Sequence, residues 1–193
     1  MTTVQVIGDH SLIQLYLKGN ESALETLIIR HRTKIYSSIY FLVRNRALAE
    51  DIFQDTFIKV IDTLRSGKYN EEGKFLPWVM RIAHNLCIDH FRRRKRMPTI
   101  RNSEGKDVFT FLKFADESKE DQMLKNESHE KVKELVEQLP DEQREVVILR
   151  HYADLSFKEI AKMTNVSINT ALGRMRYGLI NLRKMIEEKE ISL

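Results

Sequence analysis

The sequence predicts an all-α protein built of two small helical domains, and three observations support that prediction. Apolar residues recur at helical spacing along most of the 193 residues. Only seven glycines and three prolines are present, so few positions interrupt a helix. Residues 97–126 lose the periodicity and mix Pro98 and Gly105 with nearly balanced charges. We therefore expect a flexible linker there, between a domain at 1–96 and a helix-turn-helix domain at 127–193.

Four helices are expected in the N-terminal domain, over residues 11–18, 20–43, 47–64 and 75–96. Asn20 follows Gly19 and is a residue type that caps the start of a helix well. A hydrophilic loop at 65–74 separates the last two helices. Pro77 lies in the first turn after that loop, where its missing N–H leaves no hydrogen bond unmade.

The helix at 47–64 has an acidic outer face. Its core side is expected to consist of Ile52, Phe53, Phe57, Val60, Ile61 and Leu64. The opposite stripe, called the acidic face below, consists of Asp51, Gln54, Asp55, Ile58 and Asp62. Three carboxylates on one stripe repel phosphate, so we expect this surface to contact a protein, with Ile58 as an apolar contact. The plainer interpretation is a face that is simply solvated.

The helix at 75–96 has a basic outer face. Its core side is expected to consist of Val79, Ile82, Ala83, Leu86 and His90. The opposite stripe, called the basic face below, consists of Arg81, Asn85, Ile88, Arg92 and Lys95. Its cations can neutralise phosphates and release counterions, and its amide can bond a base edge. The alternative is a solvated helix end whose cations favour the C-terminal dipole.

Residues 156–184 predict a helix-turn-helix, preceded by a helix that begins at Pro140. Ser156 and Glu159 match a capping box, Asn165 ends the first helix, and Ser167 caps the second. The inner face of the second helix is expected to consist of Ile168, Ala171, Leu172, Met175, Leu179, Leu182 and Ile186. The outer face then presents Thr170, Gly173, Arg174, Tyr177, Asn181 and Lys184. Such a pair of helices suits insertion into a DNA major groove.

Composition limits the class of protein. The 32 Lys and Arg against 28 Asp and Glu give a net charge of +4, which alone identifies no partner. The single cysteine, Cys87, excludes an internal disulfide framework and fits the reducing cytoplasm. The longest apolar run, residues 39–43, is too short to span a bilayer, so no membrane insertion is expected.

Histidines and aromatic side chains give weaker signals. His84 and His90 point about 120° apart on an ideal helix, so we expect no metal site, and nothing indicates a cofactor. Tyr69 and Phe75, on either side of the loop, are candidates for stacking on unpaired bases. Trp78 flanks the expected core side of its helix and is expected to pack there.

Three segments resemble an extracytoplasmic-function (ECF) sigma factor of bacterial RNA polymerase. They read ALAEDIFQDTFIKV (47–60), FLPWVMRIAHNLCIDHFRRRKR (75–96) and LPDEQREVVILRHYADLSFKEIAKMTNVSINTALGRMRYGLINLRK (139–184). The string from Trp78 to Arg92 is the most specific part. The resemblance implies a cytoplasmic, non-catalytic initiation factor. Its partners would be core RNA polymerase, promoter DNA and, as is common in this family, an anti-sigma protein that clamps both domains.

The resemblance also assigns roles to residues. It implies that the clamp helices of the largest polymerase subunit contact Asp51, Gln54, Asp55 and Ile58, and it implies a contact with the polymerase flap region. Asn85 matches the base-contacting position for the start-proximal promoter element, where a base leaves the stack and enters a protein pocket. The further DNA contacts there would be Arg81, Arg92, Arg93 and Lys95. Those to the upstream element would be Thr170, Gly173, Arg174 and Tyr177.

The chain departs from many relatives at two positions, where Leu172 and Gly173 stand in place of a basic residue and a serine. Glycine inside a helix costs about 1 kcal/mol relative to alanine. One hypothesis is that Gly173 lets the backbone approach DNA closely, so that the upstream element differs from the commonest one. The other is a merely tolerated glycine.

Two other classes of protein stay open on the residues alone. A two-domain regulator could bind duplex DNA without polymerase, in which case the acidic face need not contact a protein. A metal-dependent nuclease on a basic scaffold would need a cluster of carboxylates or histidines, and the sequence offers no such cluster.

Overall fold

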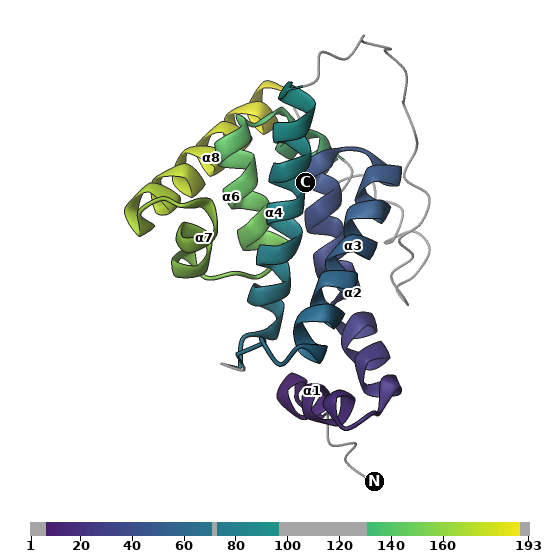
Figure 1. Cartoon of the computed structure of the whole chain (residues 1–193). Helices are drawn as coiled ribbons and strands as arrows, with labels where there is room; N and C mark the ends of the chain where they lie inside the picture. Colours follow the sequence, from purple (N-terminus) through teal and green to yellow (C-terminus); the bar gives the residue numbers. More distant parts are fainter. Residues whose placement is uncertain (1–6, 71–72, 97–130, 190–193) are drawn as a thin grey trace, which may run out of the picture.

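The computed structural model describes residues 7–70, 73–96 and 131–189, and every regular element in these ranges is a helix (Figure 1). The all-α prediction is therefore confirmed for this part of the chain. The expected linker at 97–126 lies outside the described residues. Within the described ranges, none of the helices combines the length and the apolar composition that crossing a membrane requires.

The N-terminal unit is a bundle of four helices: α1 (Asp9–Leu17), α2 (Glu21–Val43), α3 (Arg46–Arg65) and α4 (Phe75–Arg96). The long helix α2 packs against each of the other three. Its apolar stripe is buried at the centre, with Leu27, Ile35 and Ile39 almost inaccessible to solvent. The helical spacing of these side chains explains why the sequence predicted this helix correctly.

Local signals set the ends of these helices. Asn20 occupies the N-cap position of α2 as expected, although its side chain accepts from the Ser22 hydroxyl (2.7 Å) rather than from a backbone N–H. Arg44 adopts a left-handed conformation (φ 54°) and ends α2. Directly after it, the Asn45 side chain accepts a 2.9 Å hydrogen bond from the Leu48 N–H and begins α3. Caps of this kind satisfy N–H groups that the helix itself leaves free.

The C-terminal unit contains a helical segment at 131–138, α6 (Asp141–His151), α7 (Phe157–Thr164) and α8 (Ile168–Glu188). The helices α7 and α8 form the expected helix-turn-helix. The capping box of Ser156 and Glu159 is present at the start of α7, Asn165 (φ 56°) ends that helix, and Ser167 caps α8. The long helix α8 packs against both α6 and α7.

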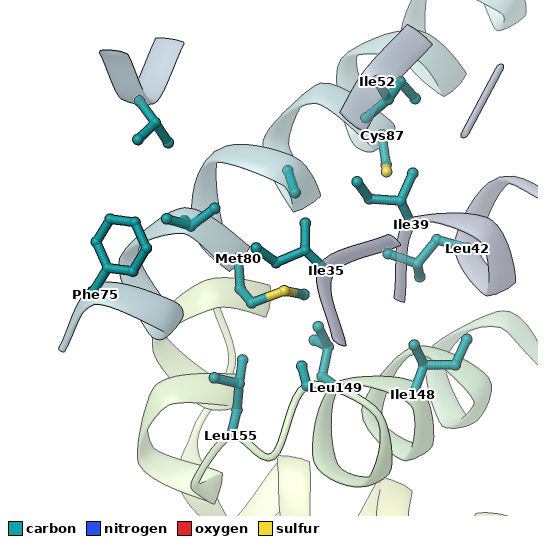
Figure 2. Close-up of a cluster of buried hydrophobic side chains, with 14 of the residues drawn as sticks. Ile35, Ile39, Leu42, Ile52, Phe75, Met80, Cys87, Ile148, Leu149 and Leu155 are labelled. Carbon is teal, nitrogen blue, oxygen red and sulfur yellow. The ribbon is translucent and has the colours of Figure 1, made fainter. Parts of the chain in front are cut away.

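The two units share one hydrophobic cluster, which the sequence did not predict. The helices α6 to α8 lie along one side of the N-terminal bundle (Figure 1). Figure 2 shows Ile35 and Met80 of the N-terminal unit beside Leu149 and Leu155 of the C-terminal unit. All four side chains are almost fully buried. The units are therefore packed against each other in this structure.

The apolar face of α8 is partly different from the expected one. Ile168, Leu172 and Leu179 were expected to point inward, but they are exposed at 46%, 43% and 43%. Ala171 is buried as expected, and the other residue that α8 buries is Gly178, which is seven positions away and lies on the same side of the helix. The expectation for these three residues failed because the inner face was centred on the large apolar side chains, whereas the closest packing is at the small residues Ala171 and Gly178.

Gly178 shows why small residues define this contact. A Cβ atom there would lie 3.1 Å from Cγ2 of Val147 on α6, which is closer than ordinary packing allows. One turn later, the Asn181 side chain, expected to face outward, donates a 2.8 Å hydrogen bond to Oε1 of Gln143 on α6. These two contacts fix how α8 lies across α6.

Candidate functional site

The acidic face lies on the outside of α3, as the sequence predicted. Its inner side is anchored by Ile52, Phe57 and Val60, which are buried in the bundle. Asp51, Gln54, Asp55, Ile58 and Asp62 are all exposed. Ile58 is 56% exposed, although it is as apolar as the residues on the buried side. An exposed isoleucine among carboxylates gives a protein partner both an apolar contact and a set of hydrogen-bond acceptors.

The basic face lies on the outside of α4. Val79, Ala83 and Cys87 anchor the inner side of the helix and are inaccessible to solvent. On the outer side, Arg81, Asn85, Arg92 and Arg93 are exposed, and the side chain of Lys95 lies outside the described residues. Arg92 lies 3.7 Å from Asp89 in an ion pair in which both side chains are more than half exposed. Such a pair is weak and leaves Arg92 available to a phosphate.

The thiol of Cys87 is part of the core. Burial raises the pKa of this thiol to about 12, so it is a protonated and unreactive group at neutral pH. This agrees with the cysteine lying on the inner side of α4, between α3 and α2.

The aromatic residues around the loop pack together, which corrects the expectation for Phe75. This side chain is 2% exposed and lies beside Trp78 (ring centroids 5.9 Å apart) and His31 (5.6 Å). It cannot stack on a base without leaving the core. Tyr69 is partly buried with its ring 4.4 Å from that of Trp78, which itself packs against the core as expected.

His84 is a buried residue that sequence reasoning did not identify as important. It is 4% exposed and directly precedes the exposed Asn85. Its Nε2 lies 2.7 Å from Oε1 of Glu145 on α6. The partner is 61 residues away along the chain, so no local pattern could have indicated it. Among the described residues, no three histidine, cysteine, aspartate or glutamate side chains gather as metal ligands would.

The outer side of α8 carries the expected upstream-element residues in different states of exposure. Thr170 is exposed, and Tyr177 is 61% exposed. Arg174 is 21% exposed and forms a 3.2 Å ion pair with Glu142 of α6. Among the described residues, a Cβ atom at Gly173 would meet no atom within 4 Å outside its chain neighbours and its own helix backbone, so packing there does not require glycine. Both hypotheses for Gly173 remain compatible with this geometry.

A second surface on α8 is apolar and flanked by cations. The residues that line this shallow hollow, called the α8 groove below, are Phe157, Leu172, Met175, Arg176, Leu179, Ile180 and Arg183. Leu172, Leu179 and Ile180 are each more than 40% exposed. Neighbouring exposed apolar side chains of this kind mark contact sites for other molecules.

Comparisons with known proteins identify the family. Residues 27–97 match Sigma-70 region 2, and residues 129–172 match Sigma-70 region 4. The chain is 29% identical to the RNA polymerase sigma factor CarQ of Myxococcus xanthus, over 94% of this chain and 99% of the relative. It is also 29% identical to the ECF RNA polymerase sigma factor SigW of Bacillus subtilis, over 89% and 92%.

Two solved structures share the fold. One is CnrH in complex with the cytosolic domain of CnrY, with a TM-score of 0.64 and 21% identity over 93% of this chain and 97% of that chain. The other is the sigma factor RpoE of Bartonella quintana in complex with the anti-sigma factor NepR, with a TM-score of 0.65 and 17% identity over 85% and 96%. Sigma factors are non-catalytic subunits of RNA polymerase. With both sigma-70 regions in order and ECF relatives along nearly its whole length, the chain belongs to the ECF sigma factors.

Proposed function

We propose that this ECF sigma factor binds core polymerase through the acidic face and promoter DNA through two separate helices. The basic face of α4 contacts the start-proximal element, with Asn85 at a base and the arginines at phosphates. The outer side of α8 contacts the upstream element through Thr170, Gly173, Arg174 and Tyr177. The observation that carries this proposal is the exposure of Asp55, Asn85 and Tyr177 on helices whose opposite sides form the core.

In this proposal the chain catalyses no reaction itself. It acts in the cytoplasm, where it directs the polymerase to a start site and the polymerase makes the bonds. The division at 97–126, between a domain at 1–96 and one at 127–193, would let the two DNA-contacting helices reach separate promoter elements.

Regulation by an anti-sigma protein is the second part of this proposal. Both similar structures are complexes of two proteins, and one of them is a sigma factor bound to an anti-sigma factor. In this chain, the α8 groove offers an apolar surface between Arg176 and Arg183, which suits an amphipathic helix with acidic flanks. The flap region of the polymerase and the anti-sigma protein would compete for the same groove. A sigma factor bound to the anti-sigma protein would therefore be unable to contact the flap and would be inactive.

Run-off transcription tests the proposed function. Purified core polymerase is incubated with genomic fragments, with and without the chain, and transcripts are mapped by sequencing. The proposal expects new start sites that share two sequence elements and depend on the chain. A chain that binds fragments but adds no start site would instead be a free-standing regulator.

A further inference from the structure

The helix α1 lies outside both matched segments, 27–97 and 129–172, and the proposed function assigns no role to it. It packs against α2, at the end of the bundle where α4 begins (Figure 1). Its side chains Leu12, Ile13 and Tyr16 are buried and belong to the hydrophobic core. Apolar packing therefore anchors α1 on the bundle, independently of its polar contacts.

Asp9, the first residue of α1, joins this helix to two neighbouring side chains of α2. Its Oδ1 accepts a 2.6 Å hydrogen bond from Nη1 of Arg30, and its Oδ2 lies 2.7 Å from Nε2 of His31. An ionised carboxylate only accepts hydrogen bonds, so Nε2 of His31 is the donor. Arg30 also donates a 2.8 Å hydrogen bond to the backbone carbonyl of Ile7. The side chain of His31, which is only 12% exposed, is thereby held in one orientation.

The ring of His31 also belongs to an aromatic cluster, which consists of His31, Tyr69, Phe75 and Trp78. His31 lies beside Phe75 (ring centroids 5.6 Å apart), and Phe75 lies beside Trp78 (5.9 Å). Trp78 in turn lies beside Tyr69 (4.4 Å). Phe75 is the first residue of α4, and Tyr69 lies in the loop before it. A continuous series of contacts therefore joins Asp9 on α1 to this loop and to the start of α4.

The same helix α4 carries the residues assigned to the start-proximal element. Arg81 and Asn85 follow Phe75 by six and ten residues, which is about 9 and 15 Å along a helix. Because the helix is rigid over this length, the position of Phe75 sets where both side chains lie relative to the loop that carries Tyr69. An unpaired strand bound at α4 would therefore meet side chains whose relative placement depends on the aromatic cluster.

We propose that Asp9 and His31 are positioning residues for the start-proximal element, because they hold the aromatic cluster in the arrangement that receives an unpaired strand. This inference rests on the proposed function, which assigns α4 to that element. Asp9 orients the ring of His31, the ring supports Phe75, and neither residue needs to touch DNA. Small misplacements of aligned groups are costly, since several contacts have to form together. Loss of the Asp9 carboxylate should therefore weaken binding of the unpaired strand.

The contacts of Asp9 contribute little to the stability of the bundle. The side chains of Asp9 and Arg30 are 28% and 29% exposed, and solvent weakens an ion pair that it can reach. The buried side chains of α1 keep this helix in place when the carboxylate is removed. A loss that is confined to DNA binding would thus distinguish positioning from folding.

The test measures binding of the complete holoenzyme to a fluorescent single-stranded oligonucleotide. The oligonucleotide carries the non-template strand of the start-proximal element, identified by run-off transcription, and a scrambled sequence gives the non-specific affinity. Asp9→Ala should bind the element about tenfold more weakly, with unchanged affinity for core polymerase and for the scrambled sequence. Asp9→Asn keeps an oxygen that can accept from His31 and should lose less. The matched control is Glu21→Ala, which removes the first acidic residue of α2 and its ion pair with Arg65, and should bind as the wild type does.

A double substitution tests whether the effect passes through His31. His31→Phe keeps a ring beside Phe75 but loses the hydrogen bond to Asp9, so it should weaken binding about as much as Asp9→Ala. The double variant Asp9→Ala/His31→Phe should bind no more weakly than either single variant, because two residues that act through one contact are not additive. Circular dichroism confirms that each variant folds.

Three results would overturn this inference. They are equal affinities of Asp9→Ala and Glu21→Ala for the element, a parallel loss of affinity for core polymerase in Asp9→Ala, and additive losses in the double variant. A wild-type holoenzyme that does not distinguish the element from the scrambled sequence would contradict the proposed function itself, and this inference with it.

Discussion

Arg174 reaches from α8 to α6, where its guanidinium lies 3.2 Å from the carboxylate of Glu142. The arginine is 21% exposed and the glutamate 72%, so the pair lies at the edge of the α6–α8 interface. An ion pair open to solvent on one side contributes little to stability. The ion pair instead restricts the Arg174 side chain to one orientation on α8, the helix that we assign to the upstream element.

Replacement of Arg174 by alanine should therefore affect DNA much more than folding. We expect a loss of about 1–3 kcal/mol in promoter binding and relaxed specificity at one upstream base pair, measured by titration of single-base promoter variants. The free energy of unfolding should change by less than about 1 kcal/mol. An even loss across all the promoter variants would show that Arg174 contacts only phosphate.

Substitutions of Asn85 and Arg92 should affect DNA binding in different ways, although both residues are exposed on α4. Asn85→Ala removes an amide that can bond a base edge, so discrimination at one start-proximal position should fall by about 1–3 kcal/mol. Arg92→Ala should weaken binding to all sequences and reduce the slope of log K against log salt by about 1. Titrations at several salt concentrations separate the two effects. If the slope of log K against log salt were unchanged in Arg92→Ala, Arg92 would not contact a phosphate.

The capping box at the start of α7 should contribute measurable stability. The Ser156 hydroxyl accepts from the Glu159 N–H (3.3 Å) and donates to its carboxylate (2.6 Å). Ser156→Ala loses both contacts and should lower the free energy of unfolding by about 0.5–2 kcal/mol in urea titrations. Thr33→Ala, at an exposed position within α2, is the control and should change it by less than about 0.5 kcal/mol. Equal effects of the two substitutions would mean that the cap contributes nothing.

The ion pair between Lys34 and Asp154 predicts a pH dependence. The hydrogen bond and the charge of Lys34 lower the pKa of Asp154 from its usual 3.8. A lowered carboxyl pKa adds stability above the unfolded value, and that stability is lost as the pH falls through the folded value. The melting temperature of the wild type should exceed that of Asp154→Asn by a constant amount near neutral pH, and the difference should shrink below about pH 4. A difference that is unchanged at pH 3 would contradict the pair. Asparagine tolerates the left-handed backbone at this position (φ 60°), so the substitution adds no strain.

Local sequence signals predicted much of this structure because they act over a few residues. The inner and outer sides of α3 follow from the spacing of Ile52, Val60 and Asp55, and both were predicted correctly. The caps at Ser156 and Ser167 were also predicted correctly, because a cap depends on the residue and the next helical turn. The exposure of Asn85 follows from the same helical periodicity.

The errors concern contacts between distant residues. Gly178 and Val147 approach each other closely, which rotates α8 so that Leu172 and Leu179 are exposed. Neither residue carries a local signal of that contact. The burial of Phe75 depends in the same way on His31 in another helix. The contact between the two units depends on pairs such as Phe41 and Tyr152, whose side chains look like ordinary core residues of separate domains.

The most direct test of the central claim reverses the charge of the acidic face. Asp51→Lys/Asp55→Lys should reduce binding to core polymerase and run-off transcription at least tenfold, because both carboxylates are exposed on the face that we assign to the polymerase. Binding of the free chain to an upstream-element duplex should not decrease. Glu50→Lys, an exposed charge reversal about 100° away on the same helix, is the control and should retain activity. Full transcription by the double variant would contradict the assignment of this face to the polymerase.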